Sequence, residues 1–328
     1  MKAVLLDGFG GPEVLKVAET QRPVPSAGQV LIKVAATSVN RPDIVQREGN
    51  YPPPKGDSEI PGLEVAGIIE EVGPGVTAYK CGERVMSLVG GGGYAQYAVA
   101  YADHLIPIPA AMSFESAACV CESYITAFLN IFMIGGLEDG HAVLVHGGGG
   151  GVNTAAIQLC RQLAPNGRVM VTASAGKVER VRQLGADLVI NYQQDDFAEA
   201  VRAFTGKKGA DVILDHIGAS YLALNMKALA VSGTLVIIGV MSGVKAELNL
   251  ALMMVKRQRI IGSVLRSRPV QEKREIIAQF TSSVMPAFAN GSIAPVIYRS
   301  YPLEHVAEAH RTMEHSEHFG KIVLTLDE

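Results

Sequence analysis

The sequence has few cysteines and no surplus of charge of either sign. Its four cysteines, Cys81, Cys119, Cys121 and Cys160, form no CxxC pair and no disulfide-framework spacing, which indicates a reducing, cytoplasmic setting. Cys119 and Cys121 are best explained as small buried side chains. Lysine and arginine total 29 against 32 acidic residues, a net charge of −3. Nucleic acid and anionic membranes are therefore not expected partners.

The sequence also lacks an uninterrupted apolar run of membrane-spanning length. The start MKAVLLDG is too short in its apolar part for a signal peptide and predicts a first strand. Two long uncharged stretches, 85–102 and 228–244, are broken by Gly, Ser or Gln and predict strands with turns, not membrane helices. With 328 residues, 48% of them hydrophobic, the chain can bury the cores of two domains.

Between residues 142 and 263, short apolar runs alternate with segments of helical period. The runs are AVLVH, VMVTA, LVI, DVILD, TLVIIG and RIIGS, and the helical segments include TAAIQLCRQL and KVERVRQL. Buried strands alternating with helices predict an α/β fold with a doubly wound parallel sheet. The flanks show short alternating strands with many Gly and Pro turns. We therefore expect a Rossmann domain over 123–264, inserted into a mostly β domain built from 1–122 and 265–328.

Five consecutive glycines in HGGGGGVNTAAIQL, residues 146–159, lie between the first of these strands and a helix. At such a turn the free N–H groups and the helix dipole attract an anion, and a pyrophosphate can approach the bare backbone. Gly147, Gly150 and Asn153 occupy the spacing of a relative of the dinucleotide-binding fingerprint. Asn153 departs from it, because the last position is normally small. A plain tight turn is the alternative, but it needs only one or two glycines.

The end of the second strand, VTASAGK, indicates which nicotinamide cofactor is used. An acidic residue about 20 positions after the glycines usually holds the ribose 2′-hydroxyl of NAD, and none stands here. Ser174 is small and polar, and Lys177 places a cation at the next helix start, where the dipole opposes it. A 2′-phosphate would explain this cation, so we predict NADPH. The alternative is a solvated surface lysine.

Several motifs carry a family resemblance. They are SVNRPDIVQREGNY (38–51), PGLEVAGIIEEVGPGV (61–76), the glycine loop with TAAIQL, LGADLVINY (184–192), VLRSR (264–268) and GKIVL (320–324). Through them the chain resembles the medium-chain dehydrogenase/reductase superfamily over essentially its full length. It looks closest to the zinc-free quinone oxidoreductases of the tumour-suppressor-inducible, NADPH-dependent branch. The resemblance implies a GroES-like catalytic domain around the Rossmann NADPH-binding domain.

Zinc alcohol dehydrogenases of this superfamily hold a catalytic metal through Cys and His ligands. The corresponding positions here are Asn40, Leu63 and a place near Glu122; Leu cannot ligate zinc and Asn is a poor ligand. The four-cysteine lobe of the structural zinc is missing from MSLVGGGGYAQY as well. We therefore expect no metal, and a hydride acceptor with its own electron sink, such as a quinone or conjugated enone.

The resemblance assigns the acceptor pocket to Asn40 and Tyr51, as neutral hydrogen-bonding groups. Both have structural alternatives, since Asn40 would also cap a turn before Pro42 and Tyr51 would also pack in a loop. Asp43 is expected to be a structural hydrogen-bonding residue.

The resemblance and the motifs together also assign the cofactor site. For two of its residues a purely structural role is the alternative: Tyr192 would also pack at the edge of the sheet, and Thr126 would also be an ordinary helix residue. The assigned residues are Thr126 at the nicotinamide carboxamide; Gly147, Gly150, Gly151 and Val152 at the pyrophosphate; Lys177 and Tyr192 at the 2′-phosphate; and Ser174 and Gly239 as further cofactor-binding residues.

The leading hypothesis is an NADPH-dependent, zinc-independent reductase of quinones or related α,β-unsaturated carbonyls. We expect a homodimer through edge strands of the sheet, or a dimer of dimers. One alternative is an enoyl-thioester reductase of the same superfamily, whose carrier phosphates would need a basic groove. Another is a non-catalytic NADPH-binding protein, as in lens-crystallin relatives. The candidates for a basic groove, for which a solvated charged surface is the alternative, are Lys256, Arg257, Arg259, Arg266 and Arg268.

Overall fold

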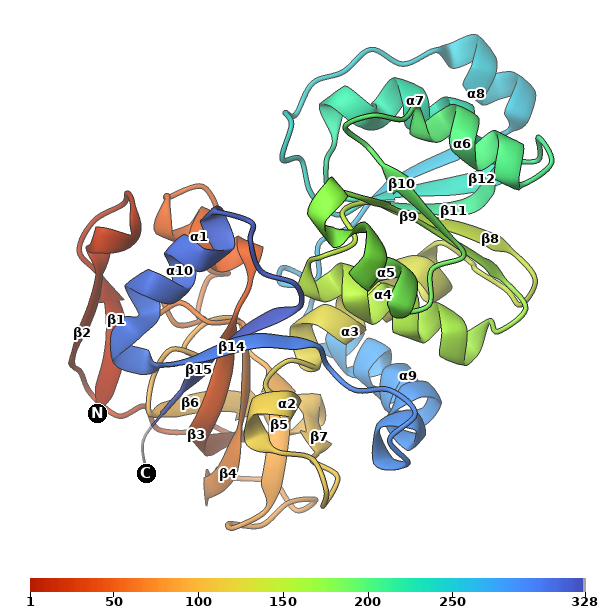
Figure 1. Cartoon of the computed structure of the whole chain (residues 1–328). Coiled ribbons are helices and arrows are strands. Elements are labelled where there is room, and N and C mark those ends of the chain that lie inside the picture. Colours follow the sequence, from red (N-terminus) through yellow and green to blue (C-terminus); the bar gives the residue numbers. More distant parts are fainter. Residues whose placement is uncertain (327–328) are drawn as a thin grey trace. The chain divides into compact units, whose positions relative to one another are not determined.

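The computed structural model describes residues 1–326, which form two compact units (Figure 1). One unit is built from residues 1–125 and the chain from Leu265 onward, and the other from residues 126–264. The second unit is therefore an insertion within the first. The α/β class, with a parallel Rossmann sheet inserted into a mostly β domain, is confirmed.

The first unit is built on a seven-stranded sheet with the order β14-β15-β3-β4-β5-β7, in which β6 also pairs with β3. A separate antiparallel hairpin joins β1 to β2. The predicted first strand is β1. The strands are β1 (Lys2–Leu6), β2 (Leu15–Glu19), β3 (Gln29–Val39), β4 (Glu64–Val72), β5 (Arg84–Leu88), β6 (Tyr97–Tyr101), β7 (Leu105–Pro107), β14 (Ile297–Pro302) and β15 (Lys321–Thr325).

Short helices cover this sheet and close the unit. Side chains of α10, β3 and β15 share one apolar core with Tyr94, and β3, β4, β5 and β6 share another. The helical elements are η1 (Pro12–Val14), α1 (Arg41–Arg47), η2 (Ala102–His104), α2 (Phe114–Ala117), α9 (Val270–Ala289), η6 (Leu303–His305) and α10 (Val306–Glu314). Helix α3 (Cys121–Phe128) crosses the boundary between the units.

The second unit holds a six-stranded, all-parallel sheet with the order β10-β9-β8-β11-β12-β13. All four residues of β8 are buried, as expected for a parallel strand covered on both faces. The chain reverses direction across the sheet between β8 and β11, which is where such sheets bind ligands at their carboxyl ends. The strands are β8 (Ala142–Val145), β9 (Arg168–Ala173), β10 (Leu188–Asn191), β11 (Ala210–Asp215), β12 (Leu229–Ile237) and β13 (Arg259–Gly262).

Helices lie on both faces of this parallel sheet, with α4 and α5 on one face and α6 and α7 on the other (Figure 1). Phe197, Val201 and Met226 from α6 and α7 pack on apolar side chains of the strands. The helical elements are η3 (Leu129–Ile134), α4 (Gly151–Leu163), η4 (Ala175–Lys177), α5 (Val178–Gln183), α6 (Phe197–Phe204), η5 (Ala219–Tyr221), α7 (Leu222–Ala228) and α8 (Leu250–Lys256).

The two uncharged stretches form strands and turns, as predicted: 85–102 contains β5 and β6, and 228–244 contains β12. One other segment, 114–134, is apolar and long enough by composition to cross a membrane. Within the protein, 78% of its apolar window is buried, which is typical of a core helix of a globular protein.

Candidate active site

The glycine loop ends in free hydrogen-bond donors at the start of α4. Gly147 N–H donates to Thr172 Oγ1 (3.1 Å) and Gly148 N–H to the Thr172 carbonyl (2.8 Å). Within residues 1–326, the N–H groups of Gly151 and Val152 have no acceptor. These are the residues assigned to the pyrophosphate, in the first turn of a 13-residue helix. Free donors at a helix N-terminus fit such an anion.

Two of the five glycines are also required by the fold. Gly147 has φ +78°, and a Cβ there would lie 2.6 Å from the ring of His216. A Cβ on Gly148 would lie 2.7 Å from methyl groups of Val171 and Val181. Packing therefore requires glycine at Gly147 and Gly148. The cofactor contact assigned to Gly147 stays a prediction, and the free donors lie further along the loop.

Asn153 replaces the small residue of the fingerprint with a structural hydrogen bond. Its buried side chain donates from Nδ2 to the carbonyl of His146 (2.5 Å), at the end of β8. A Cβ on Gly150 would lie 2.7 Å from Asn153 Oδ1. The amide thus ties α4 to the preceding strand and occupies space that Gly150 leaves open.

Lys177 lies over the glycine loop. A Cβ on Gly149 would meet Lys177 Cδ at 2.5 Å and Nζ at 3.0 Å. Burial and then the nearby Arg180 lower the pKa of Lys177. Ser174 directly follows β9, and Tyr192 directly follows β10 with 43% of its surface exposed. Lys177 therefore lies beside the glycine loop, at Gly149, and its contact with a 2′-phosphate stays a prediction.

Thr126 in α3 has a buried hydroxyl without a hydrogen-bond partner among the described residues. Buried polar groups are nearly always paired in folded proteins, so this hydroxyl fits the assigned carboxamide contact. Gly239 follows β12, and a Cβ there would lie 3.0 Å from the carbonyl of His216. Gly239 is thus explained by packing, and its cofactor contact stays a prediction.

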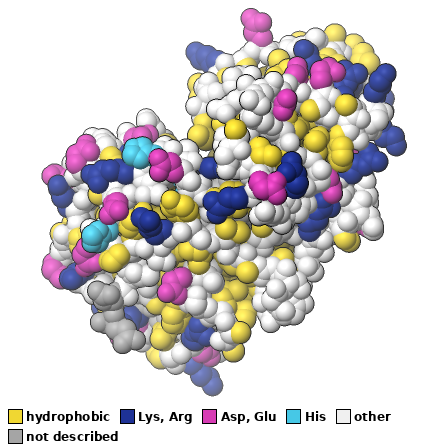
Figure 2. Space-filling view, viewed as in Figure 1, with side chains coloured by type: hydrophobic (Ala, Val, Ile, Leu, Met, Phe, Trp, Pro, Cys, Tyr) yellow, Lys and Arg dark blue, Asp and Glu magenta, His cyan; other side chains and the backbone are white. Residues whose placement is uncertain are grey.

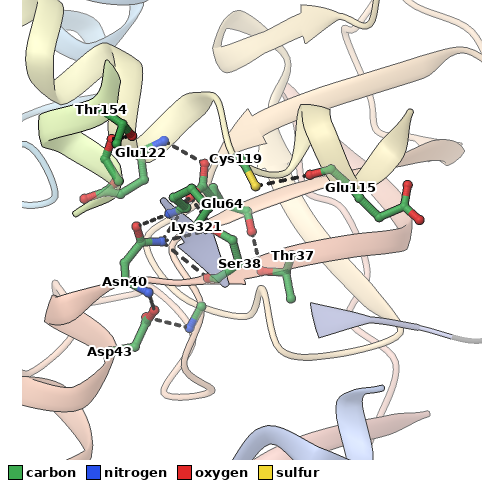
Figure 3. Close-up of polar contacts among 12 residues, drawn as sticks. Thr37, Ser38, Asn40, Asp43, Glu64, Glu115, Cys119, Glu122, Thr154 and Lys321 are labelled. Atoms are coloured by element: carbon green, nitrogen blue, oxygen red, sulfur yellow. Dashed lines mark hydrogen bonds and ion pairs between the residues drawn. The ribbon is translucent and has the colours of Figure 1, made fainter. Parts of the chain in front are cut away.

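A buried ion pair forms the centre of the other group of site residues (Figure 3). Lys321 Nζ lies 3.0 Å from Glu64 Oε1, and their side chains are 4% and 0% exposed. Ser38 Oγ donates to Glu64 Oε1 (2.6 Å), and the backbone N–H of Glu122 donates to Oε2 (2.8 Å). The sheet brings them together, because β3 lies between β15 and β4.

Asn40 joins this network with both ends of its amide. Oδ1 accepts from Lys321 Nζ (2.5 Å), and Nδ2 donates to Glu64 Oε1 (3.0 Å) and to the Ser38 carbonyl (3.3 Å). Asn40 is also the N-cap residue of α1, as its structural alternative predicted, and its backbone N–H donates to the Asp43 carboxylate (2.7 Å). Contact between Asn40 and an acceptor stays a prediction, since its amide already has internal partners.

Asp43 is structural, as expected. Its carboxyl also accepts from Gly62 N–H (3.1 Å) and Tyr94 Oη (3.0 Å). Burial raises the pKa of Asp43 to about 6, while these hydrogen bonds and the Lys321 charge oppose the rise.

Tyr51 is held by an arginine that the sequence indicated only as part of a basic group. Arg266 is 5% exposed, and its Cζ lies 5.1 Å from the centre of the Tyr51 ring. Its Nη1 donates to the Tyr51 carbonyl (3.2 Å) and its Nε to the Gly90 carbonyl (2.8 Å). Burial and then the Glu122 charge raise the pKa of Tyr51 to about 12. The Tyr51 hydroxyl is therefore a neutral donor at physiological pH.

From the sequence alone, Glu64 and Lys321 stood out only as parts of family motifs, and Glu122 only marked the place of an absent zinc ligand. The signal for the ion pair was present, because each charge stands in an otherwise apolar segment, LEVAGII or KIVLTL. Their pairing was not predictable from spacing, since 257 positions separate them.

No group of three or more His, Cys, Asp or Glu side chains in residues 1–326 is arranged to hold a metal ion. Leu63 is buried and offers no ligand atom. Cys119 and Cys121 are buried, as predicted, and burial raises the pKa of both thiols.

The five residues considered for a basic groove do not form one group. Three of them already have partners, and the five are divided between the two units. Lys256 donates to two backbone carbonyls, of Lys227 (3.0 Å) and Leu229 (2.7 Å). Arg268 pairs with Glu272, and Arg266 binds carbonyls beside Tyr51. Lys256, Arg257 and Arg259 belong to one unit, and Arg266 and Arg268 to the other.

Comparisons with known proteins agree with this geometry. Residues 26–110 match the alcohol dehydrogenase GroES-like domain family, and residues 184–324 match the zinc-binding dehydrogenase family. The quinone oxidoreductase of Lama guanicoe is 37% identical over 99% of this chain and 98% of its own length.

Two solved structures share the whole fold. Escherichia coli quinone oxidoreductase complexed with NADPH has a TM-score of 0.89 at 27% identity, over 99% of this chain and 100% of that one. An NAD-dependent alcohol dehydrogenase has a TM-score of 0.88 at 32% identity, over 100% of both chains. Neighbours of both kinds use a nicotinamide cofactor, and the free donors at α4 fit one here. The chain belongs to the medium-chain dehydrogenase/reductase superfamily and is an NAD(P)-dependent oxidoreductase.

Proposed function

We propose that this protein is an NADPH-dependent, zinc-independent reductase of quinones or related α,β-unsaturated carbonyls. The observation that carries the proposal is what stands at the positions of zinc ligands. Leu63 has no donor atom, and Asn40 is engaged with the Lys321–Glu64 pair. These residues cannot polarise an alcohol as a metal would. A quinone or enone needs less help, because it accepts a hydride into its own conjugated system.

The chain's own groups bind and orient the two reactants. The N–H groups of Gly151 and Val152 would hold the pyrophosphate, and Thr126 Oγ1 would hold the carboxamide. NADPH supplies a hydride when bound. Tyr51 donates a hydrogen bond to the acceptor oxygen, where charge develops, and Arg266 keeps the ring in place. Asn40 acts as a positioning residue through Lys321 and Glu64.

Lys177 supports the preference for NADPH over NADH. A charge-assisted contact with a 2′-phosphate contributes about 1.5–3 kcal/mol, so the preference is expected to be tenfold or more. Lys177→Glu should remove it, whereas Lys208→Glu, with the same change in net charge, should leave it intact. Equal use of both cofactors by the unmodified protein would show that Lys177 has no such role.

The reaction class is tested by NADPH oxidation with a panel of quinones, enones, an enoyl thioester and simple alcohols. We expect turnover with quinones or enones, undiminished by a chelator, and a preparation without zinc by metal analysis. About one zinc per chain with activity lost to the chelator, or rapid alcohol oxidation, would overturn the proposal. Turnover of the thioester alone would identify the enoyl reductase, and no turnover at all a non-catalytic protein.

The proposed assembly is a homodimer through the edge of the parallel sheet at β13. Beyond β13 the described chain has no further strand in this sheet. Hydrophobic side chains gather over the neighbouring helix α8 (Figure 2). A patch of this kind is typical of a protein–protein interface. On α8 itself Leu250, Met254 and Val255 are 69%, 73% and 71% exposed.

A further inference from the structure

Three carboxyl groups gather around one buried lysine in the first unit, and two of them are fully hydrogen-bonded. Glu64 accepts from Ser38, Asn40, Lys321 and the backbone of Glu122. Asp43 accepts from the N–H groups of Asn40 and Gly62 and from Tyr94.

The third carboxyl, that of Glu122, has a different environment. It lies in the first turn of α3, partly buried, with its backbone N–H fixed on Glu64 (2.8 Å). Among residues 1–326 its carboxyl group has neither a hydrogen bond nor an ion pair. The hydrogen bond from its backbone N–H to Glu64 therefore positions Glu122 without occupying its carboxyl oxygen atoms.

The cations around Glu122 have other partners, although Nη2 of Arg266 has none among the described residues. Lys321 pairs with Glu64, and Arg266 lies against the Tyr51 ring and donates to two carbonyls. Burial and then the Glu64 charge raise the pKa of Glu122 to about 8, Asp43 adds to the rise, and Lys321 and Arg266 oppose it. At neutral pH Glu122 therefore carries a proton.

We propose that Glu122 is a further catalytic residue, the protonated carboxyl that gives its proton to the acceptor oxygen during reduction. This rests on the proposed function. The acceptor gains a hydride, with its two electrons, from the reduced nicotinamide. Its oxygen then takes the proton as the O–H bond of Glu122 breaks, which yields a hydroquinone or an enol. The resulting carboxylate is protonated again from water.

Glu122 suits this role better than Tyr51. The Tyr51 hydroxyl lies within electrostatic reach of Glu122, since the Glu122 charge raises the pKa of Tyr51. With a pKa of about 12, Tyr51 holds its proton too tightly to release it at neutral pH, whereas a catalytic acid works best with a pKa near the working pH. Tyr51 orients the acceptor oxygen, and Glu122 protonates it.

The test compares Glu122→Gln with the unmodified protein and with Glu138→Gln, an exposed control carboxyl. General acid catalysis contributes about 10²–10⁴-fold, so quinone turnover should fall by that factor in Glu122→Gln, with NADPH affinity unchanged. Turnover of the unmodified protein and of the control should decline as pH rises through about 8. Glu122→Gln should lack this decline, and Glu122→Asp, which keeps a carboxyl group, should restore it at a lower rate.

A second readout needs no cofactor. The pKa of Glu122 is higher in the folded protein, so its contribution to stability is full below pH of about 4.3 and is lost as pH rises through about 8. As pH rises from 5 to 9, the melting temperature of the unmodified protein should therefore fall further than that of Glu122→Gln. An equal change of melting temperature with pH in the two proteins, or full turnover in Glu122→Gln, would overturn the role of Glu122 but leave the proposed function standing. Absence of any quinone or enone reduction by the unmodified protein would overturn the proposed function, and this proposal with it.

Discussion

At the scale of single residues, we propose that Tyr51 donates a hydrogen bond to the acceptor, and the Arg266 guanidinium lies over its ring. Tyr51→Phe removes the hydroxyl but keeps the ring that Arg266 covers. Losing one donor to a developing oxyanion should slow quinone turnover by about ten- to a thousandfold. Steady-state kinetics should show a lower kcat with NADPH affinity unchanged, and Tyr298→Phe serves as the control. Unchanged turnover would show that the Tyr51 hydroxyl has no catalytic role and that the side chain only packs against its neighbours.

The Lys321–Glu64 pair makes a second prediction at this scale. Lys321→Met leaves the Glu64 carboxylate buried without its cation, which should lower the free energy of unfolding by about 3–5 kcal/mol in urea denaturation. Adding Glu64→Gln should recover most of this loss, because the uncompensated charge is gone. Strictly additive losses in the double variant would mean that the two side chains do not stabilise each other's charge.

Asn40→Ala belongs to the same network. It leaves the Lys321 ammonium without one of its two acceptors, Asn40 Oδ1, and should lower stability by about 1–3 kcal/mol. A loss of turnover in Asn40→Ala therefore needs to be compared with its melting curve before the amide is assigned a contact with the acceptor.

At the scale of elements, the loop between β8 and α4 combines glycines that packing requires with glycines that we propose bind the cofactor. Gly148→Ala places a methyl group against Val171 and Val181, and it should lower the stability of the cofactor-free protein by about 1–3 kcal/mol. Gly150→Val should instead weaken NADPH binding far more than it lowers the melting temperature. Calorimetric titration and thermal melts measure the two effects separately.

Asn153 complicates the interpretation of Gly150→Val, because a side chain at position 150 would also meet Asn153 Oδ1. Gly150→Val should therefore be compared in an Asn153→Ala background, with Asn153→Ala alone as the control. Normal NADPH binding with early unfolding in that background would show that Gly150, like Gly147 and Gly148, is a turn residue.

At the scale of the whole molecule, the exposed apolar patch at α8 predicts a dimer in solution. Met254 is 73% exposed in the single chain, so Met254→Glu should leave the stability of the monomer unchanged while a charge opposes association. Light scattering or sedimentation should show a dimer for the unmodified protein and a shift toward monomer for Met254→Glu. Val24→Glu, at a 76% exposed position of the other unit, is the matched control. A monomeric unmodified protein would exclude this assembly.

The sequence by itself determined the fold class and the place of the glycine loop. Both are local or periodic properties, since buried parallel strands are continuous apolar runs and helices repeat every 3.6 residues. The absence of a ligand atom at Leu63 was likewise readable, because it depends on residue type alone. Lys177 was readable for the same reason, as a cation in place of an acid.

Only the tertiary structure decided how the charged residues are used. Glu64 and Lys321 meet because β3 lies between the strands that carry them, and sheet order is not written in local periodicity. Glu122 became a candidate acid only when burial and the hydrogen bonds of its neighbours were known, since desolvation and charge set a pKa. Arg266 changed from a surface charge to a buried support of Tyr51 for the same reason: partners in space, not neighbours in sequence, determine what a polar group does.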